Sequence, residues 1–152
     1  MRQSFNRWLV LILLFLIGVC WPAAVRAQAF DLSALKAKDG PFYYLVIRNI
    51  GAPILPGYSV LVSDKIPSGI IVTSITALGW TCQPLPPVIG PNLIKCTFPV
   101  LLMVVSGAYL PSIKLGFNGT PKAPNCYEVR LVDSSGKGIV ESNMKNNVAC
   151  SK

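Results

Sequence analysis

Residues 58–75, YSVLVSDKIPSGIIVTSI, decide the fold class of this chain. Two runs rich in β-branched and apolar residues, Tyr58–Val62 and Ile70–Ile75, flank the turn residues Pro67-Ser68-Gly69. Branched and aromatic side chains favour the pleated surface of a strand, whereas Pro and Gly favour turns. The stretch therefore predicts two short strands separated by a turn.

The same pattern continues on both sides of this stretch. Turn residues recur about every 8–12 residues, which is typical of a β-sandwich. With 13 Pro and 12 Gly in the chain, no uninterrupted helical period follows residue 27, and we expect at most one helical turn, within 100–105. The pattern predicts an all-β antiparallel sandwich of about seven strands, the others being Phe42–Ile50, Leu93–Phe98, Tyr109–Phe117, Cys126–Val132 and Asn147–Cys150.

The first 27 residues have the layout of an export signal. Met1–Arg7 is basic, Trp8–Val19 is an apolar run of twelve residues, and Val25-Arg26-Ala27 offers a cleavage site. A retained membrane anchor is the alternative, but a spanning helix needs about 20 apolar residues. Lipid attachment at Cys20 is disfavoured because the preceding Val19 is bulky. We predict a signal peptide at 1–27, a domain at 28–152 and no stable membrane span after cleavage.

Four cysteines remain in the predicted mature chain: Cys82, Cys96, Cys126 and Cys150. An even number in a small exported domain indicates disulfides, and four cysteines allow three pairings. Nearest-neighbour pairing is favoured, because each pair then encloses one hairpin or loop. A metal site is disfavoured because the chain has no histidine and no closely spaced cysteine pair. We expect neither a metal nor a cofactor.

The charge of the mature chain argues against nucleic-acid binding. Eleven basic and six acidic residues remain after residue 27, a formal net charge of +5. The basic residues are scattered, and they form no stripe interleaved with aromatic side chains of the kind that binds single strands. A protein or an envelope polymer is the more plausible class of partner.

Several short motifs of the mature chain follow one another in a recognisable order. They are YLVIRNIG at 44–51, VSDKIPSG at 62–69, GWTC at 79–82 with KCT at 95–97, SG at 106–107 and ESNMKNN at 141–147. Together they resemble a repeat of bacterial surface proteins, the domain of unknown function "eleven", which is related to the cell-adhesion-related CARDB domain. The resemblance implies an immunoglobulin-like sandwich, exported or surface-displayed, without catalysis. A single copy and the extra Cys126 and Cys150 favour a free module over a stalk.

Catalysis has little support in the residues themselves. Without histidine, no histidine-based triad can form, and the six acids show no spacing that pairs two carboxylates. Asp64, before the Pro-Ser-Gly turn, is expected to accept backbone N–H bonds rather than to act as a catalytic acid. We therefore predict that the protein is not an enzyme.

Two features are candidate partner contacts. Trp80 either packs against a disulfide in the core or is exposed as a stacking platform. The apolar stretch 98–105, FPVLLMVV, either folds over the open end of the sandwich or is exposed as a docking patch. The candidate contact residues are Trp80, Phe98, Leu101, Leu102 and Met103.

The sequence thus predicts a secreted, periplasmic or surface-located binding module, acting in adhesion, envelope assembly or host contact. The alternative is a structural envelope component that associates with itself through an open sheet edge.

Overall fold

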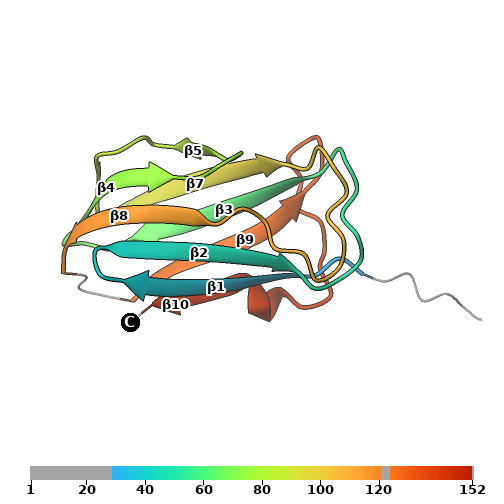
Figure 1. The fold of residues 1–152 in the computed structure, drawn as a ribbon, viewed down its shortest axis with the longest axis horizontal. Helices are drawn as coiled ribbons and strands as arrows, with labels where there is room; N and C mark the ends of the chain where they lie inside the picture. The colour runs from blue at the N-terminus through green and yellow to red at the C-terminus, as the bar shows by residue number, and fades with distance from the viewer. Residues whose placement is uncertain (1–28, 121–123, 152) are drawn as a thin grey trace, which may run out of the picture.

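The chain folds into two five-stranded antiparallel sheets packed face to face, an immunoglobulin-like β-sandwich (Figure 1). The computed structural model describes residues 29–120 and 124–151, so the predicted signal peptide lies outside the described residues. The strands are β1 Leu32–Asp39, β2 Phe42–Asn49, β3 Ser59–Ile66, β4 Ile70–Thr76, β5 Thr81–Gln83, β6 Val88–Ile89, β7 Asn92–Pro99, β8 Ile113–Gly119, β9 Asn125–Val132 and β10 Val148–Ser151, with a short 3₁₀ helix η1 at Met144–Asn147.

The order of strands is β1-β2-β8-β4-β6 in one sheet and β10-β9-β3-β7-β5 in the other. Inward-facing residues alternate with outward-facing ones along β2, β3 and β9, as the period of a half-buried strand requires. The core between the sheets is built from these inward positions, for example Leu45, Ile47, Val60, Val129 and Leu131. The predicted sandwich class is therefore confirmed.

The loops gather at the two ends of the sandwich. Segments 50–58 and 100–112 lie together where β2 and β7 end, at the right of Figure 1, and we call this the loop end. Backbone hydrogen bonds join the two segments, from Ile54 N to Val104 O and from Val104 N to Ile54 O, each at 2.9 Å. Strands β1 and β3 both start at the loop end and run away from it.

Both disulfides have the predicted nearest-neighbour pairing. Cys82 is bonded to Cys96, and Cys126 is bonded to Cys150. Each bond joins residues directly opposite each other on neighbouring strands, β5 with β7 and β9 with β10. Both therefore attach an outer strand to the same sheet, and neither joins the two sheets.

Three details of the predicted strand pattern were wrong. The structure has ten strands rather than about seven, because β1 and the very short β5 and β6 were not expected. The strand predicted at 109–117 begins only at Ile113, since Pro111 has no N–H for a ladder. The helical turn expected within 100–105 is an extended loop, and the helical turn is η1.

Strand β1 escaped prediction because its side chains oppose the usual alternation. Leu35 points outward and is exposed, whereas Lys36 points inward and is buried. An inward lysine interrupts the apolar period on which a strand prediction depends.

The polar motif at residues 141–147 closes the sandwich at the start of β1. The Glu141 carboxylate accepts hydrogen bonds from Leu32 N at 2.8 Å and from Leu131 N at 3.1 Å. The Asn147 side chain donates to Val129 O at 3.1 Å. These side chains satisfy buried backbone groups that the sheets leave unpaired. The described residues contain no helix long and apolar enough to cross a membrane.

Candidate functional site

An apolar groove lies at the loop end, between the end of β7 and the start of β8. Its volume is about 430 Å³. Its walls are almost entirely hydrocarbon and aromatic, from Gly79, Phe98, Pro99, Leu101, Leu102, Met103, Val104, Val105, Ala108, Tyr109, Leu110 and Pro111. A groove of this kind suits a ligand or partner that offers apolar groups.

The loop side chains around this groove are exposed to solvent. Leu101 is 77 % exposed, Leu102 82 % and Met103 55 %. Val105 and Tyr109 are also exposed, whereas the neighbouring Val100 and Leu110 are buried and anchor the segment. Of the two interpretations of 98–105, the structure supports the exposed patch for Leu101, Leu102 and Met103. We call Leu101, Leu102, Met103, Val105 and Tyr109 the apolar patch.

Asn49 holds the loop that carries the apolar patch. This side chain is fully buried, and its amide nitrogen donates to Val104 O and Ala52 O, each at 3.0 Å. Its amide oxygen accepts from Gly51 N at 3.1 Å. Two backbone bonds add to this clamp, from Asn49 N to Ala108 O at 2.9 Å and from Leu110 N to Ile47 O at 3.0 Å. The exposed side chains therefore stand on a fixed backbone, which lowers the entropy lost on binding.

Trp80 is not part of the exposed surface, so its assignment as a partner contact was wrong. Only 8 % of the side chain is exposed, and the indole N–H donates to Pro111 O at 2.8 Å. The ring packs against Phe98 with 5.2 Å between the ring centroids. Trp80 thus belongs to the core beside Cys82, as the alternative interpretation held.

Phe98 is half-buried and lines the groove. Gly79 lies against it, and a Cβ built at Gly79 would come within 3.0 Å of the Phe98 ring. Gly79 also has a φ of +77°, which favours glycine. Gly79 therefore lines the groove beside Phe98, whereas Trp80 is not among the lining residues.

A cationic group borders the apolar patch. Arg48 Nε donates to Gly107 O at 3.1 Å, and its guanidinium lies 5.3 Å from the centroid of the Tyr109 ring. Sequence reasoning missed Arg48 and Tyr109, because the contact joins β2 to the 100–112 loop across 61 residues of sequence. Only the arrangement of the loops brings the two together.

A second, more polar depression lies over β5 and β7. Its volume is about 500 Å³, and it is lined by Thr81, Gln83, Pro84, Leu93, Lys95 and Thr97. It lies beside the proline-rich segment 84–91, in which Leu85 is exposed.

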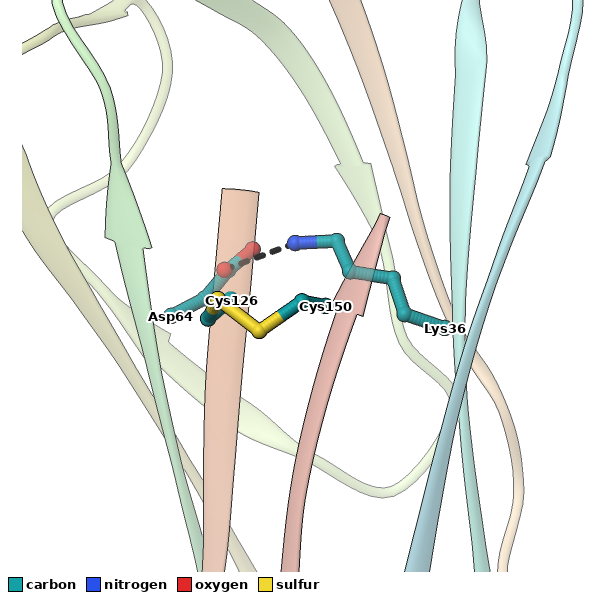
Figure 2. Close-up of a disulfide and its surroundings, with 4 residues drawn as sticks. All are labelled: Lys36, Asp64, Cys126 and Cys150. Carbon is teal, nitrogen blue, oxygen red and sulfur yellow. Dashed lines mark hydrogen bonds and ion pairs between the residues drawn. A yellow bond between two sulfur atoms is a disulfide. The ribbon is translucent and has the colours of Figure 1, made fainter. Parts of the chain in front are cut away.

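The most unusual polar feature is a charged pair buried between the sheets. Lys36 on β1 reaches across the sandwich to Asp64 on β3, with 2.8 Å from Nζ to Oδ1 (Figure 2). The side chains are 0 % and 1 % exposed. Asp64 does not cap the following turn as expected, because it faces inward from within β3.

Aromatic rings and further polar groups surround this pair. The Lys36 ammonium lies 4.9 Å from the Tyr43 ring centroid and 5.9 Å from that of Tyr127. The Tyr127 hydroxyl accepts from Leu35 N at 2.9 Å and lies 2.8 Å from Val46 O, to which it donates. The second carboxylate oxygen of Asp64, Oδ2, has no hydrogen-bond partner.

Burial moves the pKa values of this site toward the neutral forms of its groups. Desolvation lowers the pKa of the Lys36 amine and raises the pKa of the Asp64 carboxyl, and in each case the partner's opposite charge and hydrogen bond oppose the shift. Desolvation also raises the pKa of the Tyr127 hydroxyl. The pair is therefore an amine and a carboxyl in an environment that disfavours charge.

The described residues offer no cluster of three or more His, Cys, Asp or Glu side chains that could hold a metal ion. The loop end offers an apolar groove for contact with a partner, and the Arg48 guanidinium lies beside the Tyr109 ring at its border. The buried pair is closed to any partner by its burial.

No family model matches this chain, and no curated protein matches it. Solved structures are similar to it at low identity. The chitin-binding domain of a chitinase from Pyrococcus furiosus is 17 % identical, with a TM-score of 0.41, over 74 % of this chain and 99 % of that one. The sixth cohesin of scaffoldin B from Acetivibrio cellulolyticus is 9 % identical, with a TM-score of 0.45, over 80 % and 96 %. The collagen adhesin from S. aureus is 10 % identical, with a TM-score of 0.40, over 83 % and 50 %.

Proposed function

We propose that this domain is an exported, noncatalytic binding module whose apolar patch at the loop end docks a protein partner. The observation that carries the proposal is the exposure of Leu101, Leu102 and Met103 on a loop fixed by Asn49. Contact of gathered apolar side chains with water is unfavourable, and a partner that covers them gains free energy from their burial. The membership in the "eleven" repeat family remains part of the same proposal.

Export is supported by the cysteines. Two disulfides in a small domain are stable in an oxidising compartment and rare in a reducing cytosol. The signal-like composition of residues 1–27 leads to the same conclusion.

Self-association through a sheet edge has less support. The outer strands β5, β6 and β10 have only three, two and four residues, and β5 and β6 are flanked by prolines. The free edge of β1 is occupied, because Leu32 N and Leu35 N donate to Glu141 and Tyr127. Short, covered or proline-flanked edges oppose strand addition. Sizing over a range of concentrations tests this: a constant monomer is expected, and growth with concentration would favour self-assembly.

The proposal is tested by crosslinking in the producing cells, followed by mass spectrometry of proteins captured on the tagged domain. The patch variant carries Leu101→Asp, Leu102→Asp and Met103→Asp. The control is Leu35→Asp, which places one negative charge, against three in the patch variant, at an exposed leucine on β1 outside the patch. We expect a partner captured by the wild type and the control but lost from the patch variant. Equal capture by all three proteins would refute the proposal.

A further inference from the structure

Neither disulfide of the described residues joins one sheet to the other. Both disulfides lie within the sheet β10-β9-β3-β7-β5, where each joins neighbouring strands. Between the strands of the two sheets, the side chains of Lys36 and Asp64 are in hydrogen-bond contact, although the two residues are 28 apart in sequence. Figure 2 shows Lys36 extending from β1 toward Asp64, on the side of the sandwich where Cys126 and Cys150 are bonded.

The geometry brings a nucleophile against an electrophile. The Lys36 Nζ lies 2.8 Å from a carboxyl oxygen of Asp64, and both side chains are withdrawn from solvent. Because each is held by its own strand in the core, the amine and the carboxyl stay in contact as long as the domain is folded. Such fixed proximity gives an intramolecular reaction a very high effective concentration of its partner.

The surroundings favour the reactive forms of both groups. An amine attacks only when its lone pair is free, and a carboxyl group accepts attack more readily when it is protonated. Desolvation moves the pKa of Lys36 down and that of Asp64 up, and transfer of the shared proton from amine to carboxyl yields both neutral forms together. The Oδ2 atom of Asp64 has no competing hydrogen-bond partner.

We propose that Lys36 and Asp64 are a modification site, at which the side chains condense to an intramolecular amide that joins β1 to β3. The Nζ lone pair forms a bond to Cγ of the neutral Asp64 carboxyl. A proton moves from the nitrogen to the carboxyl hydroxyl, the C–O bond breaks, and one water molecule leaves. No oxidant, reductant or activating co-reactant enters this balance.

The amide links the two sheets by a bond that reducing agents do not cleave. It complements the disulfides, which attach the outer strands β5 and β10 to one sheet. A buried polar contact that is costly as an ion pair thereby becomes a neutral bond.

The test is the intact mass of the full chain, purified after folding and measured with its disulfides reduced. The reference is the mass calculated from its own sequenced N-terminus. We expect a mass lower by one water, and a proteolytic digest in which the peptide containing Lys36 is joined to the peptide containing Asp64. Fragmentation of that joined peptide assigns the two linked residues.

Two variants serve as controls. Lys36→Arg keeps the cation but cannot form this amide, and Asp64→Ala removes the acyl group, so both are expected at their full calculated mass. If either variant fails to fold, the wild-type mass and peptide map still decide the question.

Two results would overturn the proposal. One is a wild-type chain that keeps its full calculated mass after prolonged incubation in the folded state. The other is a link from Lys36 to a different residue, for example to the buried Asn125 on β9, whose side-chain amide is also without a hydrogen-bond partner. Reaction with Asn125 would release ammonia rather than water, so the mass alone separates the two cases.

Discussion

The interior near Lys36 and the surface around Leu102 differ in how each treats water. In the core, an amine and a carboxyl are shielded from water. At the loop end, three consecutive large apolar side chains, Leu101, Leu102 and Met103, are exposed to it. Solvation alone would arrange the two regions the other way round. We propose covalent linkage as the reason for the first placement and partner binding as the reason for the second.

The two regions should respond to substitution in opposite ways. Changes in the buried region are expected to alter the free energy of unfolding strongly. Changes in the apolar patch are expected to alter binding while leaving unfolding almost unchanged. The following experiments run from the largest expected effect on stability to the smallest.

The largest effect is expected from breaking the buried pair on one side. Lys36→Met or Asp64→Leu alone removes the proposed amide and leaves the other group without its partner in the core, so we expect a loss of at least about 3–5 kcal/mol in the free energy of unfolding. The double variant Lys36→Met/Asp64→Leu removes both polar groups and should be more stable than either single variant. Urea denaturation of the four proteins measures this. A double variant whose loss equals the sum of the two single losses would show that the groups do not interact.

The next effect concerns Asn49, which connects the core with the apolar patch. Asn49→Ala leaves Gly51 N and Val104 O with fewer partners, and we expect a loss of about 1–3 kcal/mol. Hydrogen exchange of the Val104 amide should accelerate, because its loop is no longer clamped. Asn118→Ala is the matched control, since the Asn118 side chain is exposed and accepts a hydrogen bond from the N–H of its neighbour Gly119. Unchanged exchange at Val104 would mean that Asn49 does not hold the loop.

A pH effect is expected from Tyr127, beside the buried pair. Desolvation raises its pKa in the folded state, whereas an unfolded tyrosine titrates near pH 10. Above pH 10 the unfolded chain therefore releases a proton that the folded chain keeps, so stability should fall as the pH rises.

Tyr127→Phe separates this effect from that of the other tyrosines. The variant should be less stable at neutral pH, by about 1–3 kcal/mol, because Leu35 N and Val46 O lose a partner. Its decline above pH 10 should be shallower than that of the wild type. The melting temperature is measured between pH 8 and pH 11. If it falls equally steeply with pH in the variant and in the wild type, Tyr127 is not the source of the alkaline loss of stability.

The smallest effect on stability is expected in the apolar patch. Leu101→Ser, Leu102→Ser and Met103→Ser should each change the free energy of unfolding by no more than about 0.5 kcal/mol, because these side chains are exposed. The comparison between the two regions fails if one of these variants unfolds as readily as Lys36→Met.

The sequence predicts strands with regular alternation of apolar and polar residues better than strand β1. Strands such as β2, β3 and β9 follow from branched and aromatic runs between turns. The spacing of the cysteines favoured the observed disulfide pairing among three possible ones. Strand β1 does not follow from such a run, because a buried Lys36 and an exposed Leu35 reverse the pattern that marks a strand.

The candidate site shows the same limit. The sequence of Leu101, Leu102 and Met103 is the same whether these side chains are buried or exposed. The loop that carries them is held by hydrogen bonds from Asn49 and Ile54, which are distant in sequence. Trp80 illustrates the converse, since its burial depends on the carbonyl of Pro111. Such long-range hydrogen bonds leave no local signal in the sequence.

The proposed binding role is tested most directly by placing a photo-crosslinking amino acid at position 102 in the producing cells, with position 35 as the matched site. Both leucines are exposed, but only Leu102 lies in the apolar patch. We expect irradiation to give a discrete adduct of one partner from position 102 and none from position 35. No adduct from position 102, or the same adducts from both positions, would contradict the assignment of the loop end as the binding surface.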